Sequence, residues 1–201
     1  MTSPTRRSRR RFAPGFAARL AAHGLRRVWA FDEGRFGLRV GLRKRWCPSG
    51  VRPPWVVHDR YEWLWLYAAV EPATGQSVFL LLPRVTKEWF AHFLEVFARE
   101  VGGGRVGLVL DGSGSHRADI PWPETLVPLP LPRYSPELNP AEQVFRVLRP
   151  KLANRIFATV AELEAALATH LQPYWEQPAL AQRLTGYPWW TTAVTTMSRA
   201  P

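Results

Sequence analysis

The sequence has little of what marks an exported or membrane-bound protein. It contains a single cysteine, Cys47, which cannot form a disulfide within the chain. No apolar run approaches the roughly 18 residues that a membrane-spanning helix needs. The N-terminal segment is rich in arginine, but no apolar stretch follows it as one would in a secretory signal. We therefore expect a protein of the reducing cytoplasm that has no membrane partner.

Acidic residues and lysines are also scarce. Lysine and arginine together number 27 against 16 acidic residues, which gives a formal net charge of +11. Only three of the 27 are lysines, and the rest are arginines, whose guanidinium groups match phosphate geometry and stay charged. This balance favours binding of a polyanion such as nucleic acid. A GC-rich genome, which favours arginine codons, explains the same excess without any binding role.

The 201 residues are enough for one domain with a proper core, and 46% of them are hydrophobic. The N-terminus predicts a basic, disordered arm over 1–13 and a short helix within 16–25. Strands follow, with a turn at Glu33-Gly34 between the first two, and then a helix capped by Thr86. The expected strands lie at 27–31, 35–43, 61–70, 77–83, 105–110 and, at an edge of the sheet, 125–132; further helices begin at Asn139 and Thr159.

This order of elements predicts an α/β fold with a mixed sheet flanked by helices. An antiparallel meander followed by a helical crossover to another strand gives such a sheet. If the crossover makes the strands that lead to Asp32 and Asp111 parallel neighbours, both carboxylates emerge at the same carboxyl edge, where open α/β sheets keep their sites. Glu142 lies in the first turn of a later helix, which we expect to face that edge.

Three oxygen ligands converging on one point suit Mg²⁺ or Mn²⁺, which are hard cations. Each carboxylate also has a purely structural interpretation. The segments Asp32-Glu33-Gly34 and Asp111-Gly112 are both typical of turns. Glu142 is the third residue of a helix capped by Asn139, so it could complete a capping box. Spacing alone leaves both interpretations open.

Three segments around these carboxylates are distinctive: FDEGRFGL, LVLDGSGSHRA and LPRYSPELNPAEQVFRVLRPKLANR. They resemble the signature blocks of the mariner-superfamily transposases of bacterial insertion sequences, and the string YSPELNPAE is the most specific part. The resemblance runs from about Trp29 to about Trp190. It implies a ribonuclease-H-like fold and a catalytic Asp-Asp-Glu triad, which falls on Asp32, Asp111 and Glu142.

The same resemblance implies a DNA transposase that cleaves phosphodiester bonds and transfers strands. It also implies that two Mg²⁺ or Mn²⁺ ions take part in the reaction. The sequence departs from the family at Gly112, where asparagine is common, and in the short interval between Asp111 and Glu142. It departs again at Pro150, where we expect the helix to kink or break.

Such transposases carry helix-turn-helix modules upstream, whereas here only about 26 residues precede the first block. We expect residues 1–26 to be a basic arm with a short helix and residues 27–201 to be the ribonuclease-H-like catalytic domain. Double-stranded DNA is the expected partner, recognised with the help of an upstream helix-turn-helix half or a homo-oligomer. We expect the protein in a bacterial cytoplasm, associated with the nucleoid.

Further residues are weaker candidates for DNA contacts. One is a histidine five positions after Asp111, and the others are arginines that share a helix face with Glu142 or line one face of a strand. The bland alternatives are a structural histidine, an ordinary ion pair on the helix and a solvated strand face. These candidates are His116, Arg146, Arg149, Arg35 and Arg39.

Two other functions compete with the transposase. A different ribonuclease-H-like enzyme, such as a junction resolvase or nuclease, would share the carboxylates but would not need the string YSPELNPAE. An inactive DNA-binding remnant of a transposase would be favoured by a broken carboxylate, but all three are present. A glycosidase with two carboxylates is disfavoured by the charge of +11.

Overall fold

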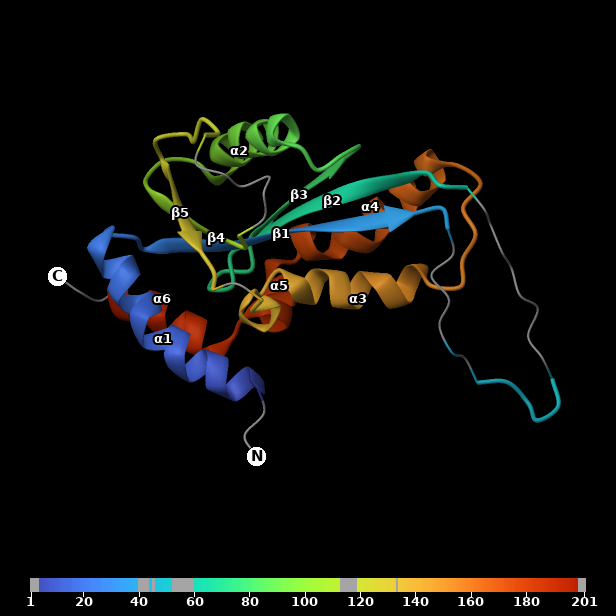
Figure 1. The fold of residues 1–201 in the computed structure, drawn as a ribbon, viewed down its shortest axis with the longest axis horizontal. Helices are drawn as coiled ribbons and strands as arrows, with labels where there is room; N and C mark the ends of the chain where they lie inside the picture. The colour runs from blue at the N-terminus through green and yellow to red at the C-terminus, as the bar shows by residue number, and fades with distance from the viewer. Residues whose placement is uncertain are drawn as a thin grey trace.

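The computed structural model describes residues 4–39, 44, 46–51, 60–112, 119–132 and 134–198. Its strands form one sheet in the order β3-β2-β1-β4-β5, with helices on both faces (Figure 1). The strands are β1 (Arg27–Gly37), β2 (Trp63–Val70), β3 (Ser77–Leu82), β4 (Val106–Leu110) and β5 (Leu126–Pro130). The helices are α1 (Pro4–Ala22), α2 (Lys87–Val101), the short 3-10 helix η2 (Pro136–Leu138), α3 (Glu142–Leu152), α4 (Val160–Glu176), α5 (Pro178–Thr185) and α6 (Pro188–Ser198).

The sheet is mixed, as the sequence predicted. β1 pairs with β2, and β2 with β3, in antiparallel register. The chain then crosses over through α2 and returns as β4, which pairs with β1 in parallel, and β5 extends the parallel half at the edge. The fold class expected from the order of elements, a mixed α/β sheet flanked by helices, is confirmed.

Strand β1 is longer than predicted and contains no turn. The ladder with β2 passes without interruption through Glu33 and Gly34, so the turn predicted there is wrong. Gly34 serves packing instead, because a Cβ at this position would lie 2.3 Å from the ring of Phe145 on α3. Residues 35–37 therefore continue the first strand rather than start a second one, and residues 40–43 lie outside the described residues.

Each face of the sheet carries its own hydrophobic cluster. On one face, α2 packs its aromatic side chains on β1: the ring centroid of Phe93 is 4.6 Å from that of Phe31, and Phe97 meets Trp29 edge to face at 5.1 Å. The other face carries the larger cluster, beneath α1, α3, α4 and α6 (Figure 1). Burial on both faces explains why β4 reads as a continuous apolar run.

The N-terminal arm predicted to be disordered is helical from Pro4 onward, because α1 has aromatic partners at the other end of the chain. The ring of Phe12 lies 5.4 Å from that of Phe16 and 5.8 Å from that of Trp189 on α6. Phe16 and Leu20 are fully buried in the larger cluster. None of the helices in the described ranges is long and apolar enough to cross a membrane.

The two capped helices begin where the sequence places them. Thr86 accepts a hydrogen bond from the N–H of Trp89 at the start of α2, and Thr159 does the same for Glu162 in α4. Helix α3, by contrast, runs through Pro150 and ends two residues later at Leu152, so no break occurs at the proline itself.

The proline- and tryptophan-rich C-terminal segment forms two helices that the sequence analysis did not assign. Helix α5 docks on the turn between β2 and β3, where Gln182 donates a hydrogen bond of 2.6 Å to the carbonyl of Ala73. Gly75 in this turn has φ +80°, and a Cβ there would lie 1.8 Å from the carbonyl oxygen of Pro178. A glycine is therefore required at this contact.

Candidate active site

Asp32 and Asp111 lie at the same level on neighbouring strands. The parallel register pairs Ala30 with Val109, and β4 ends at Leu110, so Asp111 follows directly at its carboxyl end. Asp32 was predicted at a strand end but lies inside β1, two residues beyond the last β1–β4 pair. Because β1 runs past the end of β4, Asp32 still faces the carboxyl edge, and the predicted parallel arrangement is confirmed.

Glu142 is brought to this edge by Asn139, a side chain that is only 2% exposed. Its Nδ2 donates a hydrogen bond of 2.9 Å to the carbonyl of Phe31, and its Oδ1 accepts one of 3.1 Å from the N–H of Ala141. The sequence predicted Asn139 as the cap of this helix, but α3 begins three residues later, at Glu142, with Ala141 as its N-cap, so the predicted helix start is wrong. The amide of Asn139 instead ties the segment that leads into α3 to the residue before Asp32.

The capping-box interpretation of Glu142 is wrong in this fold. The backbone N–H of Asn139, which a capping box would pair with the glutamate side chain, instead donates to the carbonyl of Pro136 at 2.9 Å. The side chain of Glu142 is thus not engaged in the cap. It lines the cavity at the edge of the sheet.

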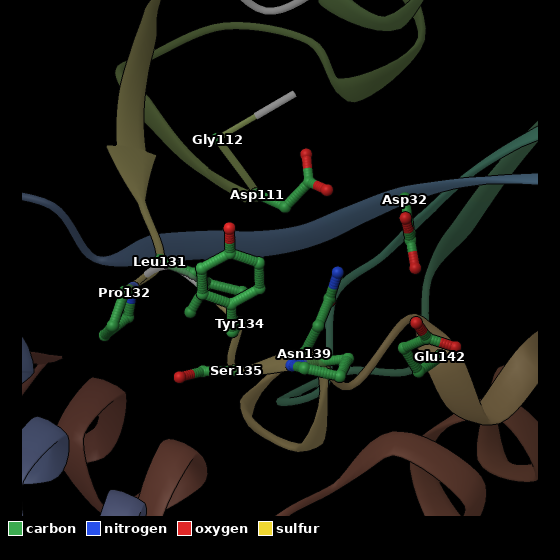
Figure 2. A pocket seen from close by; sticks show the side chains of 10 residues that line it. Asp32, Asp111, Gly112, Leu131, Pro132, Tyr134, Ser135, Asn139 and Glu142 are labelled. Carbon is green, nitrogen blue, oxygen red and sulfur yellow. The ribbon is translucent and has the colours of Figure 1, made fainter. Parts of the chain in front are cut away.

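All three predicted carboxylates line one cavity of about 440 Å³. Asp32 comes from β1, Asp111 from the end of β4 and Glu142 from the first turn of α3 (Figure 2). Figure 2 shows the carboxyl group of Asp32 above that of Glu142, with the carboxyl group of Asp111 to their left. The far wall is formed by the turn that leads to Asn139.

Burial and neighbouring negative charges together set the electrostatics of this cavity. Burial, followed by the charge of Glu142, raises the pKa of Asp32 from its ordinary 3.8 to about 8. The charges of Glu33 and Asp111 act in the same direction. The N–H of Glu33, which donates to Asp32 Oδ1 at 2.9 Å, opposes the rise only in part. A cation in the cavity would relieve this repulsion.

The donor set fits a hard divalent cation in chemistry, since it consists of carboxylate oxygens. Within the part of the chain that the structure describes, however, no three acidic, histidine or cysteine side chains are close enough to hold one ion together. Of the three carboxylates, Asp111 is the exposed one.

The other predicted contact residues do not all gather here. Arg146 lines a second cavity, of about 720 Å³, which adjoins the first because Glu142 lines both. Arg149, further along α3, is exposed and lines neither cavity. His116 lies outside the described residues.

Arg35 and Arg39 lie away from the cavity, beyond the part of the sheet that α2 covers. Both are exposed, and each guanidinium group lies over an aromatic ring of the neighbouring chain segment. Arg35 is 5.5 Å from the ring centroid of Trp63, and Arg39 is 5.6 Å from that of Tyr61. They form a separate cationic and aromatic surface rather than part of the carboxylate site.

Sequence reasoning missed the residues of the turn that closes the cavity. Tyr134 is 98% exposed at its rim and has φ 55°, which a residue other than glycine rarely adopts. Ser135 follows it in the cavity wall. The available signal was the unusual Tyr-Ser-Pro string itself.

Comparison with known proteins identifies the family of this chain. The family model described as DDE superfamily endonuclease matches residues 27–164, which include all three carboxylates. An uncharacterized protein, y4pE/y4sA of Sinorhizobium fredii (strain NBRC 101917 / NGR234), is 32% identical over 130 residues, which cover 63% of this chain and 89% of that protein.

Solved structures of the Mos1 transposase share the fold. Its paired-end complex with the left transposon end gives a TM-score of 0.64 at 17% identity, over 99% of this chain and 64% of the Mos1 chain. The Mos1 strand transfer complex gives 0.63 at 16% identity, again over 99% and 64%. The chain thus spans 64% of the length of Mos1 and has its ribonuclease-H-like fold. Because the family model covers most of the chain and the fold agrees with it, the chain belongs to the DDE superfamily of endonucleases.

Proposed function

We propose that this chain is the catalytic domain of a DNA transposase, which cleaves phosphodiester bonds and joins the cut strand to new DNA. The observation that carries the proposal is that Asp32, Asp111 and Glu142 line one cavity at the carboxyl edge of the sheet. The Mos1 structures, which contain transposon DNA and in some cases Mn or Mg, support it. Residues 27–201 form the catalytic domain, and α1, within residues 1–26, packs onto it through Phe16 and Leu20.

In this proposal Asp32, Asp111 and Glu142 hold Mg²⁺ or Mn²⁺, with two ions at full occupancy. When bound, such ions activate the attacking oxygen and stabilise the leaving one. The protein itself positions the ligands. Asn139 fixes α3 against β1, so the spacing between Asp32 and Glu142 depends on its hydrogen bond to the backbone of β1. The N–H of Glu33 orients the carboxyl group of Asp32.

The substrate is duplex DNA, which the chain holds through phosphates. The net charge of +11 provides the attraction, and Arg146 lies beside Glu142 where a phosphate next to the cleaved bond would pass. Arg149, Arg35, Arg39 and His116 remain candidates for further phosphate contacts. Recognition of specific ends is assigned to a helix-turn-helix half or to a second copy of the chain, in a bacterial cytoplasm at the nucleoid.

Nicking of supercoiled plasmid with Mg²⁺ or Mn²⁺ tests the proposal. Asp32→Ala, Asp111→Ala and Glu142→Ala should each abolish nicking, while Glu95→Ala, an exposed acid on α2, should leave it unchanged. Circular dichroism confirms that each variant is folded. Nicking that persists at the wild-type rate in any one of the three carboxylate variants rules out the shared role.

A second candidate is an inactive DNA-binding remnant, because no three acidic side chains among the described residues are close enough to hold one ion. A remnant would bind DNA with the same salt dependence but would show no metal-dependent nicking at all. The same assay therefore decides between the two functions, since only the transposase loses an activity when a carboxylate is removed.

A further inference from the structure

The carboxylate cavity opens into a longer groove along α3. It shares Pro136 and Glu142 with the second cavity, which is enclosed by α3, η2, the end of α5 and Tyr187. The second cavity in turn shares Leu184 with a third, of about 420 Å³, between the ends of α3 and α4 and the helix α5. Neighbouring cavities have wall residues in common, and we term the three together the α3–α5 groove.

The α3–α5 groove changes sign of charge with distance from the carboxylates. Beyond Glu142 its walls carry Arg146, Lys151 and Arg183, all exposed, against one further acid, Glu137. None of the three cations forms an ion pair with a described residue. The ammonium group of Lys151 lies 5.9 Å from the ring centroid of Tyr174, so it is held at the groove wall by an aromatic face.

The wall opposite α3 is fixed in place. The side-chain amide of Gln143 on α3 donates a hydrogen bond to the hydroxyl of Tyr187, just before α6. This bond joins the two sides of the second cavity next to Glu142 and Arg146. The groove is therefore a shaped surface rather than a loose gap between helices.

The length of the groove sets how much ligand it holds. Glu142 and Lys151 are nine residues apart on α3, so a rise of about 1.5 Å per residue separates them by roughly 13 Å along the helix axis. Nine residues are also about two and a half turns, which places the two side chains on opposite sides of the helix. At about 3.4 Å per nucleotide, a strand that follows the groove from one to the other needs at least about four nucleotides. Cavities of a few hundred Å³ suit single nucleotide-sized groups and not a whole duplex.

We propose that the α3–α5 groove binds a single DNA strand leaving the carboxylate site, with Arg146, Lys151 and Arg183 contacting the phosphates of about four consecutive nucleotides. The inference rests on the proposed function in one respect, that the strand is cleaved at the carboxylates. It adds two residues, Lys151 and Arg183, and a direction for the strand along α3 toward α5.

Binding without cleavage tests this groove directly. Hairpin duplexes with single-stranded tails of 0, 2, 4 and 8 nucleotides, on either the 3′ or the 5′ end, are titrated by fluorescence anisotropy in EDTA. For tails of one polarity the affinity should rise with length up to about four nucleotides and then level off. Tails of the other polarity should add much less, because the groove leads away from the site in one direction.

Charge removal identifies the groove residues. Lys151→Ala and Arg183→Ala should each remove most of the gain from the tail and lower the slope of log Kd against log salt by about 0.7, the value for one single-strand phosphate contact. Arg99 is an exposed arginine in the last turn of α2, on the other face of the sheet. Arg99→Ala is therefore the matched control, which should keep the gain from the tail and the salt slope of the wild type. If Arg183→Ala lowers the melting temperature, Arg183→Gln repeats the test with most of the side chain retained.

Three results overturn the inference. The first is a wild-type affinity that does not depend on tail length, and the second is a loss of tail-dependent affinity in the Arg99→Ala control equal to that in the groove variants. The third is a change of oligomeric state in Arg183→Ala, measured by sedimentation, with its DNA affinity unchanged. The last would make the groove a contact between copies of the chain. Failure of the proposed function is separate, because Asp111→Asn should lose nicking yet keep tail-dependent binding. Tail binding in a wild-type chain that never nicks DNA would refute catalysis and leave the groove standing.

Discussion

The raised pKa of Asp32 links the stability of the metal-free protein to pH. In the folded chain this carboxyl group holds its proton up to about pH 8, whereas in the unfolded chain it ionises near its ordinary pKa of 3.8. Between these values the folded state binds more protons than the unfolded state, so stability must fall as pH rises through the window. Asp32→Asn removes the titrating group and keeps the oxygen that accepts from the N–H of Glu33.

The size of the effect follows from the same pKa. A rise from 3.8 to about 8 corresponds to nearly 6 kcal/mol at about 1.36 kcal/mol per pKa unit. Because solvent still reaches this half-buried carboxyl group, we take about half, or ~3 kcal/mol. In a chain of this size that is on the order of 6–12 °C in Tm. Without metal, the difference in Tm between Asp32→Asn and the wild type should therefore grow by this amount as the pH rises from 4 to 9.

Scanning calorimetry in EDTA at constant ionic strength, at pH 4, 6, 8 and 9, measures the difference. Glu95→Gln on α2 is the control, whose difference from the wild type should not vary with pH. A constant difference between Asp32→Asn and the wild type across the series would show that the carboxyl group is not crowded as described.

Magnesium extends the same experiment to the proposed ion site. With a dissociation constant near 1 mM, about 10 mM Mg²⁺ should stabilise the wild type by roughly 1.4 kcal/mol, or on the order of 3–5 °C. Asp32→Asn should lose most of this gain, so magnesium should narrow its advantage at pH 8. Equal responses to magnesium in the two proteins would exclude Asp32 as a ligand.

Three further substitutions test the supports of the site. Gly34→Ala should lower stability by about 1–3 kcal/mol, measured by urea unfolding, because its Cβ would meet the ring of Phe145; an unchanged midpoint would contradict that contact. Gly75→Ala should cost at least as much, since it adds a positive φ to a clash with the carbonyl of Pro178. Asn139→Asp keeps the acceptor for the helix N–H but lacks the donor to β1, so it should lower both Tm and nicking, and wild-type nicking would refute the positioning role.

The carboxyl edge of the sheet could be predicted because its signals are local. The continuous apolar run before Asp111 predicts a buried strand, and the spacing of Phe90, Phe93 and Phe97 predicts the crossover helix. Parallel neighbours then follow from the topology of the crossover. The turn at Gly34 failed for the opposite reason: glycine has the same local appearance whether it frees the backbone for a turn or makes room for a ring from a distant helix.

The C-terminal helices and the helical N-terminus were beyond local patterns, because their partners lie far apart along the chain. Phe12 on α1 packs against Trp189 on α6, and no periodic pattern around either residue points to the other. The same separation hides the α3–α5 groove, whose walls join Arg146 and Lys151 to Arg183 across an intervening helix. Short strings can specify cleavage chemistry because the ligands need only strand ends and one helix start. A surface that guides a strand needs the packing of whole helices, so this part of the function emerges only with the fold.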